Sequence, residues 1–281
     1  VDSGGCIDLD ALDAALDPAK TALVSVMWAN NETGTIQPIA AIAARCAAAG
    51  VPFHSDAVQA TGKIPIDLAE YPGLTMLSLA GHKIHGPKGI GALIVRQGTR
   101  LEPFTFGGHQ EQGLRPGTEN VPGIVGLGAA AVAATKCLAT QVERIAMLRD
   151  RFEQSVIDTI PDVRRNGDPA TRTANTANLC FQGIPASAAL LMLDQAGIAC
   201  SAGSACCAGQ TTASHVLKSM GLCDADGRAS LRFSLSRYTT PEDIDAAIEA
   251  LQRIIPELRS MSGYKDEAAV ARYRAAQPVA E

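Results

Sequence analysis

Short apolar runs alternate with longer helix-like segments over the first half of the chain. The runs 24–28 and 74–79 have the length of buried strands, and a third run ends at Phe53. Between them, the alanine-rich segment 38–49 is typical of a helix and ends at Gly50, where a C-terminal cap is expected. This alternation of strands and helices predicts an α/β fold with a mostly parallel sheet.

The pattern changes after Val121. A long alanine-rich stretch through Asp150 is typical of a helix, and we expect it to link two domains. Beyond it come two strand-like runs and two helix-like segments, at 178–181, 231–235, 187–195 and 241–258. We therefore predict a large domain over 1–135 and a small α+β domain over 136–281, with a cysteine loop at 200–212.

Composition narrows the class of protein. The chain has 281 residues, of which 47% are hydrophobic, enough for a substantial core. A net charge of -5 with only 24 basic residues argues against a nucleic-acid-binding surface. Charge or glycine interrupts the alanine-rich stretches before the ~20 residues of a membrane span, so we expect no membrane insertion. The eight cysteines are irregularly spaced, which favours reduced thiols and a cytoplasmic location.

Lys83 is the most informative residue of the chain. It follows the strand-like run 74–79 and the small residues Ala80 and Gly81, which let the backbone turn. A lysine that is desolvated there, or close to a protonated His82, loses proton affinity and can attack a carbonyl, although a solvated loop lysine fits the same pattern. A phosphate-binding loop is excluded because Pro87 and the lysine after it stand where Lys-Ser/Thr is required.

Polar residues also follow the other two predicted strands. Asp56 comes just after Phe53, and Gln59 comes three residues later. A carboxylate can keep the pyridine nitrogen of pyridoxal phosphate protonated, and an amide one helical turn on can donate to its phenolic oxygen. Asn31 follows the first strand, where it could contact a cofactor or cap the next helix. Because ligands lie outside the carboxyl ends of parallel strands, we expect Asn31, Asp56 and Lys83 to line one cleft.

The segment 200–209 surrounds its three cysteines with glycine, serine and alanine, so nothing bulky shields the thiols. A thiol here could act as a nucleophile beside a cationic lysine, or it could be a buried apolar residue. The spacing of Cys200 and Cys206 and the lack of a second histidine near His215 speak against a metal site.

Six motifs span nearly the whole chain in a fixed order. They are Asn30-Asn-Glu-Thr-Gly34, His54-Ser-Asp-Ala-Val-Gln59, Gly81-His-Lys-Ile-His-Gly-Pro-Lys-Gly89, Arg115-Pro-Gly-Thr-Glu-Asn120, Gly203-Ser-Ala-Cys206 and Arg232-Phe-Ser-Leu235. In these motifs the chain resembles the cysteine desulfurases, which are pyridoxal-phosphate-dependent transferases of the aspartate-aminotransferase-like fold. The Gly-Ser-Ala-Cys form is similar to that of the branch serving nitrogenase and general iron–sulfur cluster assembly.

The resemblance implies a cofactor role for each matching residue of the large domain. Lys83 would form the Schiff base with pyridoxal 5'-phosphate, Asp56 would hold its pyridine nitrogen, and Gln59 would contact its phenolic oxygen. His82, a further catalytic residue, would approach the cofactor phosphate. Thr118 would reach the phosphate bound by the partner subunit, which implies a homodimer.

The resemblance also implies the reaction. Asn31, which would touch the cofactor as well, and Arg232 would hold the carboxylate of L-cysteine. An arginine fork suits this task, although an ordinary surface ion pair fits the same strand pattern. Cys206 would take the sulfur as a persulfide, release L-alanine and pass the sulfur to an acceptor scaffold protein. Another enzyme of the same cofactor class, such as a selenocysteine lyase, is the alternative.

Three features depart from the family pattern. Ala80 stands where a serine usually contacts the phosphate, so cofactor affinity is expected to be lower. Cys207 stands where threonine is common, and we expect no role for it. The chain starts at Val1, and roughly the first quarter of a family member does not precede it. We therefore expect an enzyme that is cleaved, split or only partly recorded. A separate N-terminal fragment would then be its partner, or the chain would have an inactive assembly role. The presence of a targeting peptide stays an open question.

Overall fold

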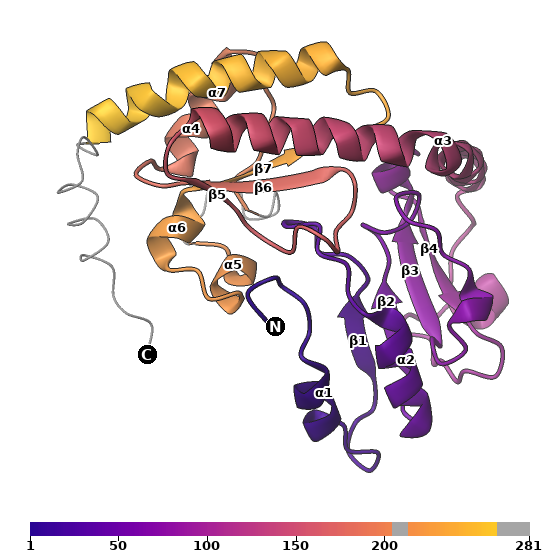
Figure 1. Cartoon of the computed structure of the whole chain (residues 1–281). Coiled ribbons are helices and arrows are strands. Elements are labelled where there is room, and N and C mark those ends of the chain that lie inside the picture. Colours follow the sequence, from indigo (N-terminus) through magenta and orange to yellow (C-terminus); the bar gives the residue numbers. More distant parts are fainter. Residues whose placement is uncertain (204–212, 263–281) are drawn as a thin grey trace. The chain divides into compact units, whose positions relative to one another are not determined.

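The computed structural model describes residues 1–203 and 213–262 (Figure 1). The chain forms two compact units that interleave in sequence. The parallel-sheet unit consists of Leu9–Ala29 and Gln37–Ala139; the antiparallel-sheet unit consists of Val1–Asp8, Asn30–Ile36 and the chain from Thr140 onward. The predicted domain boundary at 135/136 falls inside a single long helix, described below, and stays a prediction.

The parallel-sheet unit is built on a four-stranded sheet. Its strands follow the order β1 (Val24–Met27), β2 (Phe53–Asp56), β3 (Met76–Ala80) and β4 (Gly91–Val95). The first three are parallel, and β4 runs antiparallel to β3. This confirms the predicted mostly parallel sheet, to which β4 adds a strand that the sequence did not reveal.

Helix α2 (Ile39–Ala48) supplies the crossover that a parallel β1–β2 pair requires. It buries Ile39, Ile42, Ala43 and Cys46, the three- and four-residue spacing of one helical face, and it contacts β2. The helix predicted over 38–49 is therefore confirmed. Shorter helical segments complete the unit: α1 (Leu9–Ala15), η1 (Leu68–Glu70), η2 (Gly81–Ile84) and η3 (Glu111–Gly113).

Helix α3 (Val121–Thr159) continues from the parallel-sheet unit into the antiparallel-sheet unit. Small residues let its first half approach η2 closely. A Cβ atom built on Gly126 would lie 2.5 Å from Cγ of Pro87, and Ala130 and Ala134 pack on Ile84. The long helix predicted through Asp150 is confirmed and extends nine residues further.

Among the described residues, α3 is the one helix that is long and apolar enough to cross a membrane by length and composition. The sequence expectation that no apolar stretch approaches this length was wrong, because residues 121–140 contain a single charged residue, Lys136. The second half of α3 is different: Leu148, Phe152 and Val156 join a protein core and charged residues lie between them. Over that half, α3 has the pattern of an amphipathic helix.

The antiparallel-sheet unit has three strands in the order β5 (Val163–Arg165), β6 (Thr176–Phe181) and β7 (Ser230–Ser234). All six residues of the central strand β6 are buried. The sheet is accompanied by four helices: α4 (Ala186–Gln195), α5 (His215–Ser219), α6 (Asp224–Arg228) and α7 (Pro241–Ser262). The strands and helices predicted for this part of the chain are confirmed as β6, β7, α4 and α7.

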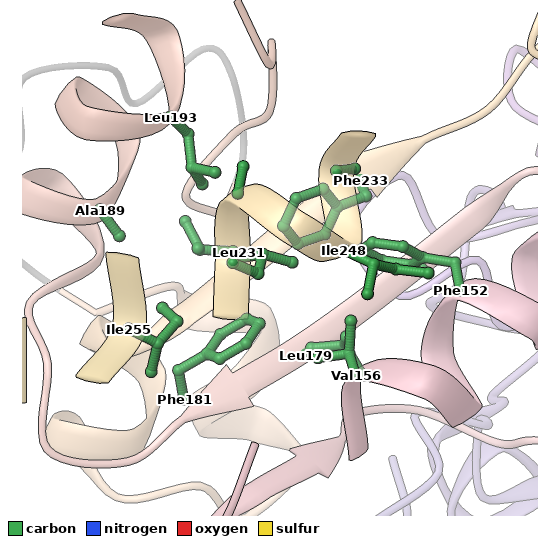
Figure 2. Packing of buried hydrophobic residues seen from close by; sticks show 14 of the residues in the cluster. Phe152, Val156, Leu179, Phe181, Ala189, Leu193, Leu231, Phe233, Ile248 and Ile255 are labelled. Carbon is green, nitrogen blue, oxygen red and sulfur yellow. The ribbon is translucent and has the colours of Figure 1, made fainter. Parts of the chain in front are cut away.

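One hydrophobic core holds this unit together (Figure 2). Side chains of α3, β6, β7, α4 and α7 meet there, and the phenyl rings of Phe152 and Phe233 lie 4.8 Å apart at 57°. Helix α7 contributes an apolar stripe that includes Leu251, Ile254 and Ile255, each fully buried. Burial of one such side chain stabilises the fold by about 1.5–3 kcal/mol, so the core outweighs any single polar contact.

A buried ion cluster borders this core. Glu153 of α3 is fully buried, and it accepts two hydrogen bonds from Arg172, at 2.5 and 2.7 Å, and one from Arg165 at 2.6 Å. The Arg172 side chain is only 3% exposed. Such a pair adds little net stability over apolar packing, but loss of one member leaves an uncompensated buried charge.

Candidate active site

The carboxyl edge of the parallel sheet brings two of the predicted site residues together. Asp56 is the last residue of β2, and Lys83 lies on η2, which follows β3 directly. Because β2 and β3 are parallel and Asp56 pairs with Ser78, both side chains belong to the same edge. Lys83, its neighbour His82 and Asp56 are all exposed. An accessible amine and an accessible carboxylate thus share one end of the sheet.

The turn that carries Lys83 depends on glycine. A Cβ atom built on Gly86 would lie 2.9 Å from the carbonyl oxygen of Gly81, and the Gly86 amide donates to that oxygen at 2.8 Å. Between them His85 adopts a left-handed conformation with φ of 64°. Ile84, next to Lys83, is buried against α3. Lys83 therefore projects from a closed turn that Ile84 anchors to α3.

The side chains of Asp56 and Gln59 each have one polar atom that is hydrogen-bonded to a neighbouring residue and a second polar group that can meet a ligand. Asp56 Oδ1 accepts from the amide of Val58 at 2.9 Å, and Oδ2 has no hydrogen bond with the described part of the chain. Gln59 Oε1 accepts from Lys63 Nζ at 2.6 Å, which leaves the amide group of Gln59 as a donor. Asp56 thus serves as a turn residue and also keeps an oxygen for a ligand.

His54 carries a role that the sequence did not reveal. Its Nδ1 lies 2.8 Å from Ser25 Oγ, and its Nε2 lies 3.2 Å from Ser78 Oγ. The ring therefore ties β1, β2 and β3 together with both nitrogens. Both ring nitrogens are engaged in these contacts, so His54 is poorly placed to act as a general base.

The antiparallel-sheet unit brings Asn31 and Arg232 together. Arg232 lies on β7, and its Nη1 donates to the carbonyl oxygen of Asn31 at 2.8 Å. The side chain that caps the local turn belongs to Asn30, whose Oδ1 accepts from the amides of Glu32 at 2.8 Å and Thr33 at 3.0 Å. The N-cap of the next helix, α2, is Pro38, so Asn31 does not cap that helix, and a ligand contact for Asn31 stays a prediction.

Arg232 is also joined to the start of the cysteine loop. Ser201 forms an isolated antiparallel bridge with it, through hydrogen bonds of 3.0 and 2.6 Å between their backbones. Cys206 itself lies outside the described residues, as does Cys207. Thr118 is described, is exposed, and follows a turn in which Arg115 Nη1 donates to the carbonyl oxygen of Gly117 at 2.9 Å.

Two described thiols are ruled out as nucleophiles by their environment. Burial raises the pKa of Cys180 to about 12, with a smaller contribution from the charge of Asp226. Burial alone raises the pKa of Cys200 to about 12. Since the thiolate is the reactive form, neither is a nucleophile at neutral pH. For these two cysteines the apolar interpretation holds.

Comparisons with known proteins identify the family. The model of the family described as aminotransferase class-V matches residues 1–247. A cysteine desulfurase from Gluconacetobacter diazotrophicus is 49% identical over 272 residues, which are 97% of this chain and 68% of that protein. The chain belongs to the cysteine desulfurases of aminotransferase class V. The cysteine desulfurase NifS of Azotobacter vinelandii is 47% identical and is matched over 94% of this chain and 65% of its own length.

Solved structures agree with this family. A NifS-like protein from Rickettsia africae superposes with a TM-score of 0.83 at 34% identity, over 92% of this desulfurase chain and 68% of that protein. A structure described as SspA in complex with cysteine gives a TM-score of 0.68 at 35% identity, over 85% and 65%. The predicted fold is therefore confirmed. The chain spans about two thirds of the length of these relatives.

Pyridoxal phosphate is the cofactor that this family implies, and the side chains at the carboxyl edge fit it. A primary amine, a carboxylate oxygen without a hydrogen bond to the described residues and an amide donor belong to one end of the parallel sheet, as Lys83, Asp56 and Gln59. These are the three groups that the aldehyde, the ring nitrogen and the phenolic oxygen require.

Proposed function

We propose that this chain acts as a cysteine desulfurase that converts L-cysteine to L-alanine and retains the sulfur on Cys206. One observation carries the proposal: Lys83 and Asp56 belong to the same edge of the parallel sheet, in a chain that also carries Cys206 in a Gly-Ser-Ala-Cys motif. The family membership and the 49% identity to a cysteine desulfurase support it.

Four residues would hold the cofactor. Lys83 would bind the aldehyde, Asp56 Oδ2 would accept a hydrogen bond from the protonated ring nitrogen, and the Gln59 amide would donate to the phenolic oxygen. His82, exposed beside Lys83, would meet the phosphate. Pyridoxal phosphate, when bound, supplies an electron sink for bonds around the substrate α-carbon. When it is not bonded to the aldehyde, the amine of Lys83 would act as a base that moves protons at that carbon.

Residues of the antiparallel-sheet unit would bind the substrate and transfer its sulfur. The guanidinium of Arg232 would grip the carboxylate of L-cysteine, with the side chain of Asn31 beside it. The Cys206 thiolate would then attack the substrate sulfur. A sulfur–sulfur bond forms, the carbon–sulfur bond breaks, and its electron pair with one proton completes the methyl group of L-alanine. The sulfur remains on Cys206 as a persulfide.

The wider setting follows from the same proposal. We infer that the persulfide sulfur goes to an acceptor protein for iron–sulfur cluster assembly and that the enzyme works as a cytoplasmic homodimer. Thr118 lies in a loop region that also exposes Phe104 at 96% and Phe106 at 87%. Exposed aromatic side chains are typical of partner surfaces. All six described cysteines are free thiols, which suits a reducing compartment.

Visible absorption spectroscopy of the chain mixed with pyridoxal phosphate tests the proposal. We expect a protein-bound cofactor band that changes on addition of L-cysteine, followed by formation of L-alanine. Lys83→Ala should remove the band, whereas Lys88→Ala, in the same exposed turn, should keep it. Cys206→Ala should keep the band and stop alanine formation.

Three results would contradict the assignment. A band that survives in the Lys83 variant would move the covalent link to another lysine. Alanine formation that survives in the Cys206 variant would favour a lyase of the selenocysteine type, which needs no protein thiol. A wild-type chain that binds cofactor but leaves L-cysteine unchanged would leave the assembly role as the better account.

A further inference from the structure

Glu32 is a buried carboxylate that the proposed reaction does not use. It is 1% exposed and lies in the segment Asn30–Ile36 of the antiparallel-sheet unit. Its Oε2 accepts a hydrogen bond from Ser214 Oγ at 2.6 Å, and no lysine, arginine or histidine of the described chain forms a salt bridge with it. Burial of a carboxylate is costly unless a hydrogen bond offsets it, so the Ser214 contact is held tightly.

Glu32 is hydrogen-bonded to one end of the segment that carries Cys206 and lies beside the other end. Ser214 lies at the carboxyl end, where its hydroxyl also accepts from the amides of Val216 at 3.1 Å and Leu217 at 3.4 Å to start α5. Gly203 lies at the amino end, and a Cβ atom built on it would be 3.5 Å from Glu32 Oε2 and 3.5 Å from Ser214 Cβ. One carboxylate oxygen thus binds the carboxyl end of the segment and lies next to its amino end.

The backbone of Glu32 is fixed to the substrate side of the unit. Its amide donates to Asn30 Oδ1 at 2.8 Å, and its carbonyl oxygen accepts from Asn178 Nδ2 at 3.1 Å. The preceding carbonyl, that of Asn31, accepts from Arg232. The residues that hold the ends of the cysteine segment and those proposed to hold the substrate carboxylate therefore form one connected framework.

We propose that Glu32 is a positioning residue for sulfur transfer. By holding Ser214 beside Gly203, in the same framework as Arg232, it determines how often Cys206 meets the substrate sulfur. The four residues proposed to hold the cofactor belong to the parallel-sheet unit and not to the unit of Glu32, so loss of the Glu32 side chain should leave cofactor loading intact. The inference rests on the proposed function, because it assumes that Cys206 receives the sulfur.

The test separates substrate binding from sulfur transfer in the chain loaded with pyridoxal phosphate. Glu32→Ala is compared with wild type in two assays: the L-cysteine concentration that half-saturates the absorption change, and the rate of L-alanine formation in a single turnover. We expect the half-saturation to stay within about twofold and the single-turnover rate to fall roughly 10- to 100-fold, as the loss of one charge-assisted hydrogen bond allows.

Two variants make the result specific. Ser214→Ala removes the same hydrogen bond from the other side, and it should slow the single turnover with no further loss when combined with Glu32→Ala. Glu242→Ala removes an exposed carboxylate from the same unit and should change neither assay. An unchanged single-turnover rate, or equal losses in both assays, would overturn the proposal. If instead Cys206→Ala still forms alanine, the proposed function fails, and that result does not depend on Glu32.

Discussion

Arg232→Lys offers the sharpest test of the substrate side. The backbone of residue 232 keeps its place in β7 and its bridge to Ser201 in any variant, so the substitution changes only the side-chain contacts. Lysine keeps the positive charge. It loses the planar fork that binds a carboxylate with two parallel hydrogen bonds while a further N–H donates to the carbonyl oxygen of Asn31.

The size of the effect follows from the number of bonds lost. Loss of one hydrogen bond between charged partners costs about 1.5–3 kcal/mol. In kcat/KM for L-cysteine this corresponds to a decrease of roughly 10- to 150-fold. Loss of the neutral Asn31 contact should lower the free energy of unfolding by about 1 kcal/mol. Cofactor absorption should not change, because the proposed cofactor residues belong to the other unit.

Steady-state alanine formation and urea denaturation measure the two effects separately. Arg228→Lys, at an exposed position of the same unit, is the matched control and should leave both values unchanged. A kcat/KM within twofold of wild type would refute the assignment of Arg232 as the carboxylate ligand. A lower free energy of unfolding with an unchanged kcat/KM would show that Arg232 has only a structural role.

Three further predictions follow from the described residues. Glu153→Gln should lower the free energy of unfolding by about 3–5 kcal/mol in urea denaturation, because its arginine partners keep a buried charge. Burial raises the pKa of Cys180 and Cys200 from 9.0 to about 12, so the folded state favours the protonated thiols. Their stabilising effect is complete below pH 9 and should fade between pH 9 and 12 in the same assay. Gly86→Ala should cost about 1–3 kcal/mol and weaken cofactor absorption, because the new methyl group meets the carbonyl oxygen of Gly81.

Each of these has a control within the chain. Glu143→Gln, exposed on the same helix as Glu153, should change stability by less than about 0.5 kcal/mol. A Cys180→Ala and Cys200→Ala double variant should show a weaker decline of stability above pH 9, and an identical decline would contradict the linkage. Gly128→Ala, in open space on α3, should stabilise the chain by about 0.5–1 kcal/mol, in contrast to Gly86→Ala.

The elements that follow from local pattern were predicted well. Strands β1 and β3 and the amphipathic helices α2, α4 and α7 have continuous or periodic apolar residues that need no knowledge of their partners. Strand β2 was placed too early, because the predicted apolar run ends at Phe53, where β2 begins and continues through polar residues to Asp56. Strand β4 was missed because Gly89 before it and Gly91 at its start suggest a turn. Residues 92–95 are a short apolar run with largely exposed side chains, and pairing with β3 makes this run a strand.

The sequence predicted which residues belong to the candidate site, but local pattern did not predict the contacts between them. The sequence predicted Asp56 and Lys83 at one sheet edge, because parallel strands impose it. Asn31 and Arg232 were brought together by the family resemblance and not by local pattern, because the two are separated by 201 residues and their hydrogen bond uses a backbone carbonyl. The cap role of Asn30 and the buried setting of Glu32 are equally invisible, because both depend on partners that adjacent residues do not specify.

The interleaving of the two units has a consequence for synthesis. The segment Asn30–Ile36 emerges from the ribosome early, but its partners on β6 and β7 follow about 150 to 200 residues later. At 5–20 residues per second, the later partner arrives after roughly 10–40 s. During this interval the carboxylate of Glu32 and the carbonyl groups beside it remain hydrated. The parallel-sheet unit can therefore form first, and translation must pass Arg232 before the other unit can close around its own N-terminal residues.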